Sequence, residues 1–111
     1  MVDHLYIYCV YNPCIHVHGC NDCVKIGVTR DLKRRFNELS GTYVPVPYKL
    51  VDVIICPAGL RHLERDLHKF YSDRRIDLKK EFFNVSRNDI IQRFQQIRDE
   101  YDLPHPMEVD G

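Results

Sequence analysis

Two short segments with a strand pattern follow one another before any helical pattern begins, and this order most restricts the fold. Residues 4–10, H-L-Y-I-Y-C-V, alternate and are rich in Tyr, Ile and Val, the residue types that favour strands. Residues 23–28, C-V-K-I-G-V, form a second segment of this kind. Two successive strands with no helix between them can pair in antiparallel fashion. The sequence therefore predicts a sheet that begins with an antiparallel pair.

The rest of the chain alternates between helical and extended patterns. Apolar residues recur at helical spacing in residues 31–39, 57–71 and 86–101. Strand patterns mark residues 48–56 and 81–85. The order β-β-α-β-α-β-α predicts an α+β domain, a small and mainly antiparallel sheet of three or four strands flanked by about three helices. The side chains expected to face the core from these helices are Leu32, Phe36, Leu39, Leu60, Leu63, Leu67, Phe70, Ile90, Ile91, Phe94 and Ile97.

Residues at the helix starts support these boundaries. Ser, Thr and Asp side chains accept hydrogen bonds from the first amides of a helix. Thr29 or Asp31 is therefore expected to cap the first helix, and Ser86 the last. Pro57 is expected to open the middle helix, because proline fits the first helical turn.

Length and charge set the frame for function. We assign residues 1–103 to one domain and residues 104–111 to a flexible acidic tail. Residues 1–98 hold all 16 Lys and Arg residues but only 11 of the 16 acidic ones, so this part carries a net charge of +5. A basic body favours a polyanionic partner.

The sequence shows no apolar run of about 18 residues and no leader pattern. It contains five cysteines, an odd number. We therefore expect an intracellular protein with reduced thiols and no membrane partner.

The segment C-I-H-V-H-G-C-N-D-C is rich in potential metal ligands. Cys20 and Cys23 have the C-x2-C spacing that zinc sites use, and Cys14 with His16 or His18 could complete a tetrahedral site. A zinc ion would staple this loop. Loosely packed thiols and a disulfide are the other two interpretations.

Four residues of the first two strands could act together. Tyr6 and Tyr8 share one face of the first strand, and Lys25 and Gly27 share one face of the second. If the strands pair, Tyr8 and Lys25 can lie close together, while Gly27 leaves space for backbone or ligand. An adjacent ammonium would lower the pKa of a tyrosine from its usual ~10. The structural alternative is that the tyrosines pack normally and the lysine extends from an edge strand.

In this order the residues resemble the GIY-YIG nuclease superfamily. The first triplet is Tyr6-Ile7-Tyr8, the second is Lys25-Ile26-Gly27, and Arg35 follows the lysine by ten residues. The segment L-E-R-D-L-H, residues 63–68, resembles the helix that carries the family's metal-binding glutamate. The strand E-F-F-N-V, residues 81–85, resembles one of the phage and viral DNA-binding branch. The chain departs from the family pattern where Tyr6 stands for the first glycine and Lys25 for the second tyrosine.

The resemblance implies a metal-dependent endonuclease that hydrolyses DNA phosphodiester bonds. Glu64 would hold one Mg²⁺ or Mn²⁺ ion, with water and phosphate completing its shell. Arg35 would stabilise the charge that develops in the transition state, and Tyr8 would orient or deprotonate the attacking water. Further candidate catalytic residues are Tyr6, Lys25 and His68. A helix ion pair between Glu64 and His68, or between Arg35 and Glu38, is the structural alternative.

Basic residues near these positions would hold the DNA backbone. The candidates are Arg30, Lys33, Arg34, Arg74 and Arg75. The DNA would be duplex or branched, and a homodimer would supply the surface for sequence reading that a small monomer lacks. Two other functions fit the same sequence: a DNA-binding module on this fold with little or no nuclease activity, and a zinc-stapled interaction domain.

Overall fold

The computed structural model describes residues 4–13, 23–39, 41, 47–76 and 82–105. One antiparallel sheet has the strand order β3-β1-β2-β4. The strands are β1 (His4–Tyr11), β2 (Cys23–Thr29), β3 (Lys49–Pro57) and β4 (Phe82–Asn84). The α-helices are α1 (Leu32–Leu39), α2 (His62–Phe70) and α3 (Arg87–Glu100). The α+β class and the antiparallel pairing of the first two strands are confirmed.

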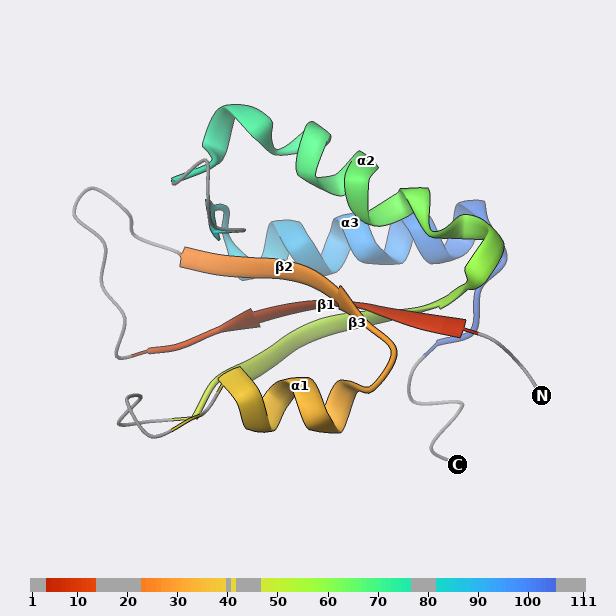
Figure 1. The fold of residues 1–111 in the computed structure, drawn as a ribbon. Helices are drawn as coiled ribbons and strands as arrows, with labels where there is room; N and C mark the ends of the chain where they lie inside the picture. The colour runs from red at the N-terminus through yellow and green to blue at the C-terminus, as the bar shows by residue number, and fades with distance from the viewer. Residues whose placement is uncertain (1–3, 14–22, 40, 42–46, 77–81, 106–111) are drawn as a thin grey trace.

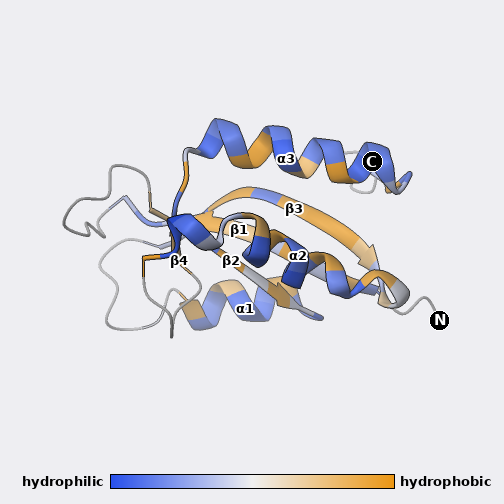
Figure 2. Cartoon of the chain, turned by 90° about the horizontal axis from the view of Figure 1, so that it is seen from above, coloured by the Kyte–Doolittle hydropathy of each residue, from blue (hydrophilic) through white to orange (hydrophobic). Residues whose placement is uncertain are grey.

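The helices cover both faces of the sheet. Figure 1 shows α1 on one face and α2 with α3 on the other. Side chains alternate along β1, so Tyr8 and Val10 pack towards α1, whereas Ile7 and Cys9 pack towards α2 and α3. Figure 2 shows hydrophobic residues along the side of α3 that faces the sheet, where Ile90, Phe94 and Ile97 are buried together with Arg98. The larger core is therefore between the sheet and the α2–α3 layer.

The middle helix begins later than predicted. β3 continues through Pro57, a 3-10 turn follows at Ala58–Leu60, and α2 starts only at His62. Proline fits this position because a strand at the edge of a sheet tolerates a residue without an N–H donor. Pro57 is therefore the N-cap residue of the 3-10 turn, and the predicted α-helix starts only at His62.

Two of the predicted core residues are on the surface. Phe70 is 54% exposed and Ile91 is 44% exposed. Tyr71, one residue after α2, is buried in the position expected for Phe70. Arg93 covers the Phe70 ring instead, with its Cζ 4.2 Å from the ring centroid. The other predicted core residues of α2 and α3 are buried, and those of α1 and Leu60 are partly buried against the core.

The predicted helix caps are present. Asp31 Oδ1 accepts a hydrogen bond from the Arg34 amide at 3.0 Å, and Thr29 Oγ1 accepts one from the Asp31 amide at 3.2 Å. Ser86 Oγ accepts a hydrogen bond from the Asp89 amide at 3.2 Å. These caps satisfy amides that the first turn of a helix leaves without a partner.

A buried ion pair joins α3 to the outer strand β3. Nη1 and Nη2 of Arg98 lie 3.1 and 3.0 Å from the two carboxylate oxygens of Asp52. Nη1 also donates to the Val53 carbonyl at 3.0 Å, and Asp52 Oδ1 accepts from the Val53 amide at 2.8 Å. Gln95 Oε1 accepts a further hydrogen bond from Arg98 Nη2 at 3.0 Å. Removing one partner of such a pair leaves a buried charge uncompensated.

α3 ends in a turn that uses a left-handed residue. The Leu103 amide donates to the Arg98 carbonyl at 2.8 Å, and Asp102 between them has φ 53°. This arrangement satisfies a terminal carbonyl of the helix. Of the acidic tail predicted over residues 104–111, only the first two residues belong to the described part. Among the described residues, no helix has the length and apolar character needed to cross a membrane.

Candidate functional site

Tyr8 lies opposite Gly27 in the register of β1 and β2. A Cβ atom placed on Gly27 would lie 2.5 Å from the Tyr8 hydroxyl oxygen and 2.7 Å from its Cζ. The tyrosine ring therefore fills the space that the glycine leaves, and any side chain at this position would collide with it. Tyr8 itself is only 2% exposed. The two triplets of the sequence thus meet in one packing contact.

We expect Gly27→Ala to lower the free energy of unfolding by about 1–3 kcal/mol, because a methyl group would overpack this contact. Tyr8→Val removes the ring, so Gly27→Ala should cost less in that background. Urea denaturation of the wild type, both single variants and the double variant measures the coupling. Equal costs of Gly27→Ala in the two backgrounds would contradict the contact.

Lys25 lies on the same face of the sheet as Tyr8, because it pairs with Val10 in the register. Its Nζ is 5.5 Å from the centroid of the Phe82 ring on β4. This distance suits a cation–π contact. The lysine therefore places a positive charge next to Phe82, the first residue of β4, on the face of the sheet that carries Tyr8.

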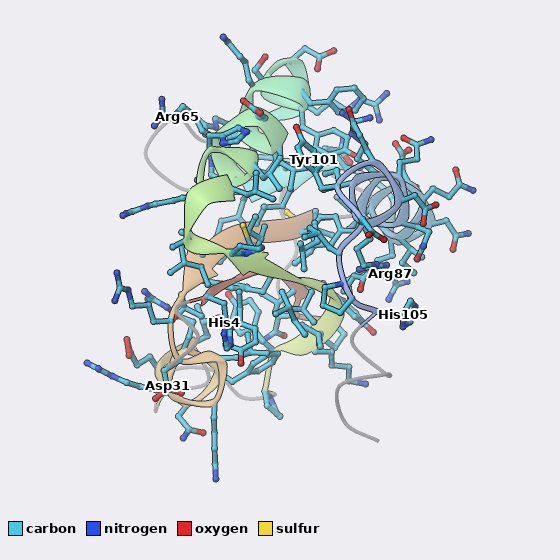
Figure 3. The ribbon with its side chains drawn as sticks, turned by 90° about the vertical axis from the view of Figure 1, so that its right-hand side faces the viewer. His4, Asp31, Arg65, Arg87, Tyr101 and His105 are labelled. Carbon is cyan, nitrogen blue, oxygen red and sulfur yellow. The ribbon has the colours of Figure 1, made fainter. Side chains whose placement is uncertain are left out.

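Tyr6 forms a pair with His4 on this face. The Tyr6 hydroxyl oxygen is 3.0 Å from His4 Nε2, and the two rings meet edge to face with centroids 5.1 Å apart. Figure 3 shows His4 on the side of the sheet that faces α1. His4 was not among the residues predicted for the site, although the i, i+2 spacing on a strand indicates that His4 and Tyr6 share a face.

Arg35 flanks the apolar stripe of α1. Its side chain is 40% exposed, and Nη1 lies 3.7 Å from Glu38 Oε2. Its Nε is buried and has no hydrogen-bond partner among the described residues. A buried donor without a partner is costly, and the oxygen of a ligand would satisfy it.

His68 fixes α2 to β2 through both of its ring nitrogens. Arg75 Nη2 lies 3.0 Å from His68 Nδ1. A guanidinium can only donate, so Nδ1 accepts and Nε2 carries the proton. Nε2 therefore donates to the Ile26 carbonyl at 2.9 Å. Glu64 Oε2 lies 3.5 Å from the same Nε2, so the histidine also sets the position of this carboxylate.

Four of the candidate residues lie around β2, namely Tyr8, Lys25, Glu64 and His68, whereas Tyr6 contacts His4 and Arg35 contacts Glu38 on α1. β4 pairs with β2 only from Cys23 to Lys25, so within the described ranges no strand pairs with this side of β2 beyond Lys25. Tyr8 crosses one face of the strand at Gly27, and α2 brings Glu64 to the other face. The sheet thus places the two triplets and the glutamate around one short stretch of strand.

The predicted DNA-binding residues fall into two groups. Arg30, Lys33 and Arg34 are exposed at the end of β2 and on α1. Arg74 is paired with Asp89, with 3.5 Å between Nη1 and Oδ2. Arg75 packs over the Phe83 ring at 5.4 Å while it holds His68. The second group is therefore engaged in the packing of α2, β4 and α3.

Metal ligands were predicted in two places. In the described ranges no three His, Cys, Asp or Glu side chains gather as a metal cluster. Glu64 is a single carboxylate, which fits Mg²⁺ or Mn²⁺, because such ions take one or two carboxylates together with water and substrate phosphate. Of the candidate zinc ligands, Cys14, His16, His18 and Cys20 fall outside the ranges that the structure describes. Cys23 starts β2 and is half-buried.

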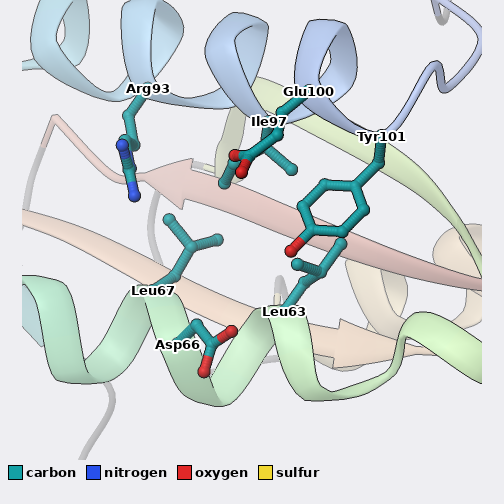
Figure 4. Close-up of a pocket in the computed structure, with 7 residues that line it drawn as sticks. All are labelled: Leu63, Asp66, Leu67, Arg93, Ile97, Glu100 and Tyr101. Atoms are coloured by element: carbon teal, nitrogen blue, oxygen red, sulfur yellow. The ribbon is translucent and has the colours of Figure 1, made fainter.

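A cavity of about 170 Å³ lies between α2 and α3, away from these residues (Figure 4). Asp66, Glu100 and Arg93 bring charges of both signs to its lining. It is on the far side of α2 from the edge of β2. We therefore do not assign it to the candidate site.

Comparison with models of protein families matches residues 4–98 to the family described as the T5orf172 domain. The matched range includes all four strands and nearly all of α3. Neither the curated proteins nor the solved structures gave a match.

Proposed function

Since the chain belongs to the T5orf172 domain family, we propose that it is a metal-dependent endonuclease that hydrolyses DNA phosphodiester bonds through a GIY-YIG-type site. Membership of this phage-associated family is compatible with a DNA-related role. The nuclease activity and the type of site are our proposal. We propose that it acts inside the cell on duplex or branched DNA.

The arrangement around β2 is the observation that carries the proposal. Tyr8 and Gly27 pack together on one face of the strand, and Glu64 is held against the other face by His68. Among the described residues no strand pairs with the outer edge of β2 beyond Lys25, where His68 of α2 binds the Ile26 carbonyl. A phosphodiester group at this edge would be close to residues from both faces.

Arg35 would bind the scissile phosphate. Its Nε is a buried donor that no described residue satisfies, and its Nη1 lies 3.7 Å from Glu38 Oε2. Phosphodiester hydrolysis adds negative charge to the phosphate oxygens in the transition state. A positioned guanidinium stabilises that charge more than the charge of the ground state.

Glu64 would hold the divalent ion, which when bound supplies Lewis acidity at the phosphate and a more acidic water molecule. His68 would act as a positioning residue, because Nδ1 accepts from Arg75 and Nε2 donates to Ile26. The burial of Tyr8 favours a positioning role for this residue as well. Lys25 would add positive charge at the same edge.

The test is cleavage of labelled plasmid and branched DNA with Mg²⁺ or Mn²⁺, beside an EDTA control. Cleavage that requires the metal supports the proposal. DNA binding without cleavage of any substrate would instead identify a DNA-binding module on this fold. Sedimentation with and without DNA would test the homodimer that sequence reading by so small a domain requires.

Arg35→Ala should reduce kcat by about 10²–10³-fold, as expected for the loss of one donor to the transition state. Glu38→Gln is the matched control, because it removes the 3.7 Å ion pair of Arg35, together with the 3.2 Å ion pair of Arg34 with the same carboxylate, and keeps both arginines. An exposed ion pair contributes only about 0.2–1 kcal/mol, so this variant should cleave as the wild type does. Equal losses in the two variants would assign Arg35 to a surface ion pair.

A further inference from the structure

A second cavity lies where β2 ends and α2 begins. Its volume is about 140 Å³, and its lining residues are Leu5, Val28, Thr29, Arg30 and Arg61. Leu5 is buried and Val28 is half-buried, so the two form an apolar floor. The two arginines are exposed and supply positive charge at the wall. None of the predicted catalytic residues lines this cavity.

The chemistry of this lining suits a phosphate group. The guanidinium of arginine is planar and presents several donors to the oxygens of one phosphate. Arg30 directly follows β2, and Arg61 directly precedes α2, so two separate elements bring arginines to one cavity. The nearby carboxylate of Asp31 accepts a hydrogen bond from the Arg34 amide at 3.0 Å. This negative charge is therefore directed at the first turn of α1.

The cavity is in line with the proposed metal ligand. Arg61, Glu64 and His68 are spaced by three and four residues, so they follow one side of α2. His68 shows that this side faces the edge of β2. Three residues, a rise of about 4.5 Å, separate Arg61 from Glu64 along the helix axis.

We propose that the cavity of Arg30 and Arg61 binds a backbone phosphate of the nucleic acid next to the phosphate that is cleaved. This inference rests on the proposed function for the identity of its ligand. The bound phosphate fixes where along the strand the cleaved bond lies. Arg61 is then a binding residue, and it takes no part in the chemical step.

The first experiment measures binding of a fluorescein-labelled DNA duplex in EDTA over a series of salt concentrations. Arg61→Ala should weaken binding about 5–20-fold and reduce the slope of log K against log salt by about 1, as for the loss of one phosphate contact. The matched control is Arg65→Ala. Figure 3 places Arg65 on α2 at the periphery of the molecule, and it does not line the cavity. An equal effect of the two substitutions would overturn the inference.

Cleavage kinetics separate binding from chemistry. In Arg61→Ala, KM should rise by the same factor as the dissociation constant while kcat at saturating DNA stays unchanged. DNA cleavage with wild-type KM in this variant would overturn the inference and leave the proposed nuclease function standing.

The second experiment uses inorganic phosphate, with amide and arginine Nε–H signals followed by NMR. Shifts at Val28, Arg30 and Arg61 that disappear in Arg61→Ala would support the site. If these shifts and the Arg61-dependent binding of DNA occur without any cleavage, the phosphate site stands and the nuclease function fails. Phosphate shifts elsewhere, together with unchanged DNA binding, would overturn the site.

Discussion

Glu64→Ala should reduce kcat for DNA cleavage by at least about 10³-fold, because a bound metal ion contributes several kcal/mol to the transition state. The carboxylate lies 3.5 Å from Nε2 of His68, which binds the Ile26 carbonyl of β2. Steady-state cleavage of plasmid DNA at fixed Mg²⁺ measures the effect. Binding of DNA in EDTA should change little, since no metal ion is then present.

Asp66→Ala is the matched control for this prediction. Asp66 is on the same helix, but its carboxylate is exposed and lies 4.0 Å from His62. This variant should cleave DNA at the wild-type rate. Wild-type cleavage by Glu64→Ala, with an unchanged melting temperature, would remove Glu64 from the site and reduce its pairing with His68 to a helix contact.

Arg98→Ala should lower the free energy of unfolding by about 3–5 kcal/mol, the cost of breaking a buried ion pair from one side. The arginine is buried and donates to Asp52, to the Val53 carbonyl and to Gln95. Its loss leaves the Asp52 carboxylate without its counter-charge. Urea denaturation followed by circular dichroism measures the change.

The double variant Asp52→Ala with Arg98→Ala tests the cause. Removing both charges leaves none of them buried alone, so the pair of substitutions should cost less than the sum of the single ones. Additive costs would show that Arg98 acts through packing alone. If Arg98→Ala lowered the free energy of unfolding by less than about 1 kcal/mol, the Asp52–Arg98 pair would contribute no more than an exposed ion pair does.

The sheet and the helices α1 and α3 could be predicted, because the sequence signals for these elements are local. Alternation in residues 4–10 and 23–28, and the cap at Ser86, depend on neighbouring residues only. The exposure of Phe70 could not be predicted in this way. It depends on where α2 ends and on Arg93 from another helix, which covers the ring. The bond between Asp52 and Arg98 likewise joins residues 46 positions apart.

The candidate site was predictable to a similar extent. Pairing of the first two strands was expected to bring Tyr8 close to Lys25, whereas the register sets Tyr8 opposite Gly27 and Lys25 opposite Val10 on the same face. A gap was expected at Gly27, whereas the ring of Tyr8 fills this space. The hydrogen bond from Arg75 to His68 could not be predicted, because it depends on the path that the chain takes between α2 and β4. Arg61 gave no local signal, because its cavity is formed only when β2 and α2 meet.

The bond between Asp52 and Arg98 has a consequence for the behaviour of the protein at high concentration. β3 is an outer strand, and the free edge of such a strand is a template for the addition of another chain. The Val53 amide donates to the Asp52 side chain, and the Val53 carbonyl accepts from Arg98. Neither backbone group of Val53 is therefore available to pair with an added strand. The ion pair therefore disfavours the edge-to-edge pairing of β3 with another chain, which leads to aggregation. Loss of Arg98 should make even the folded protein less soluble.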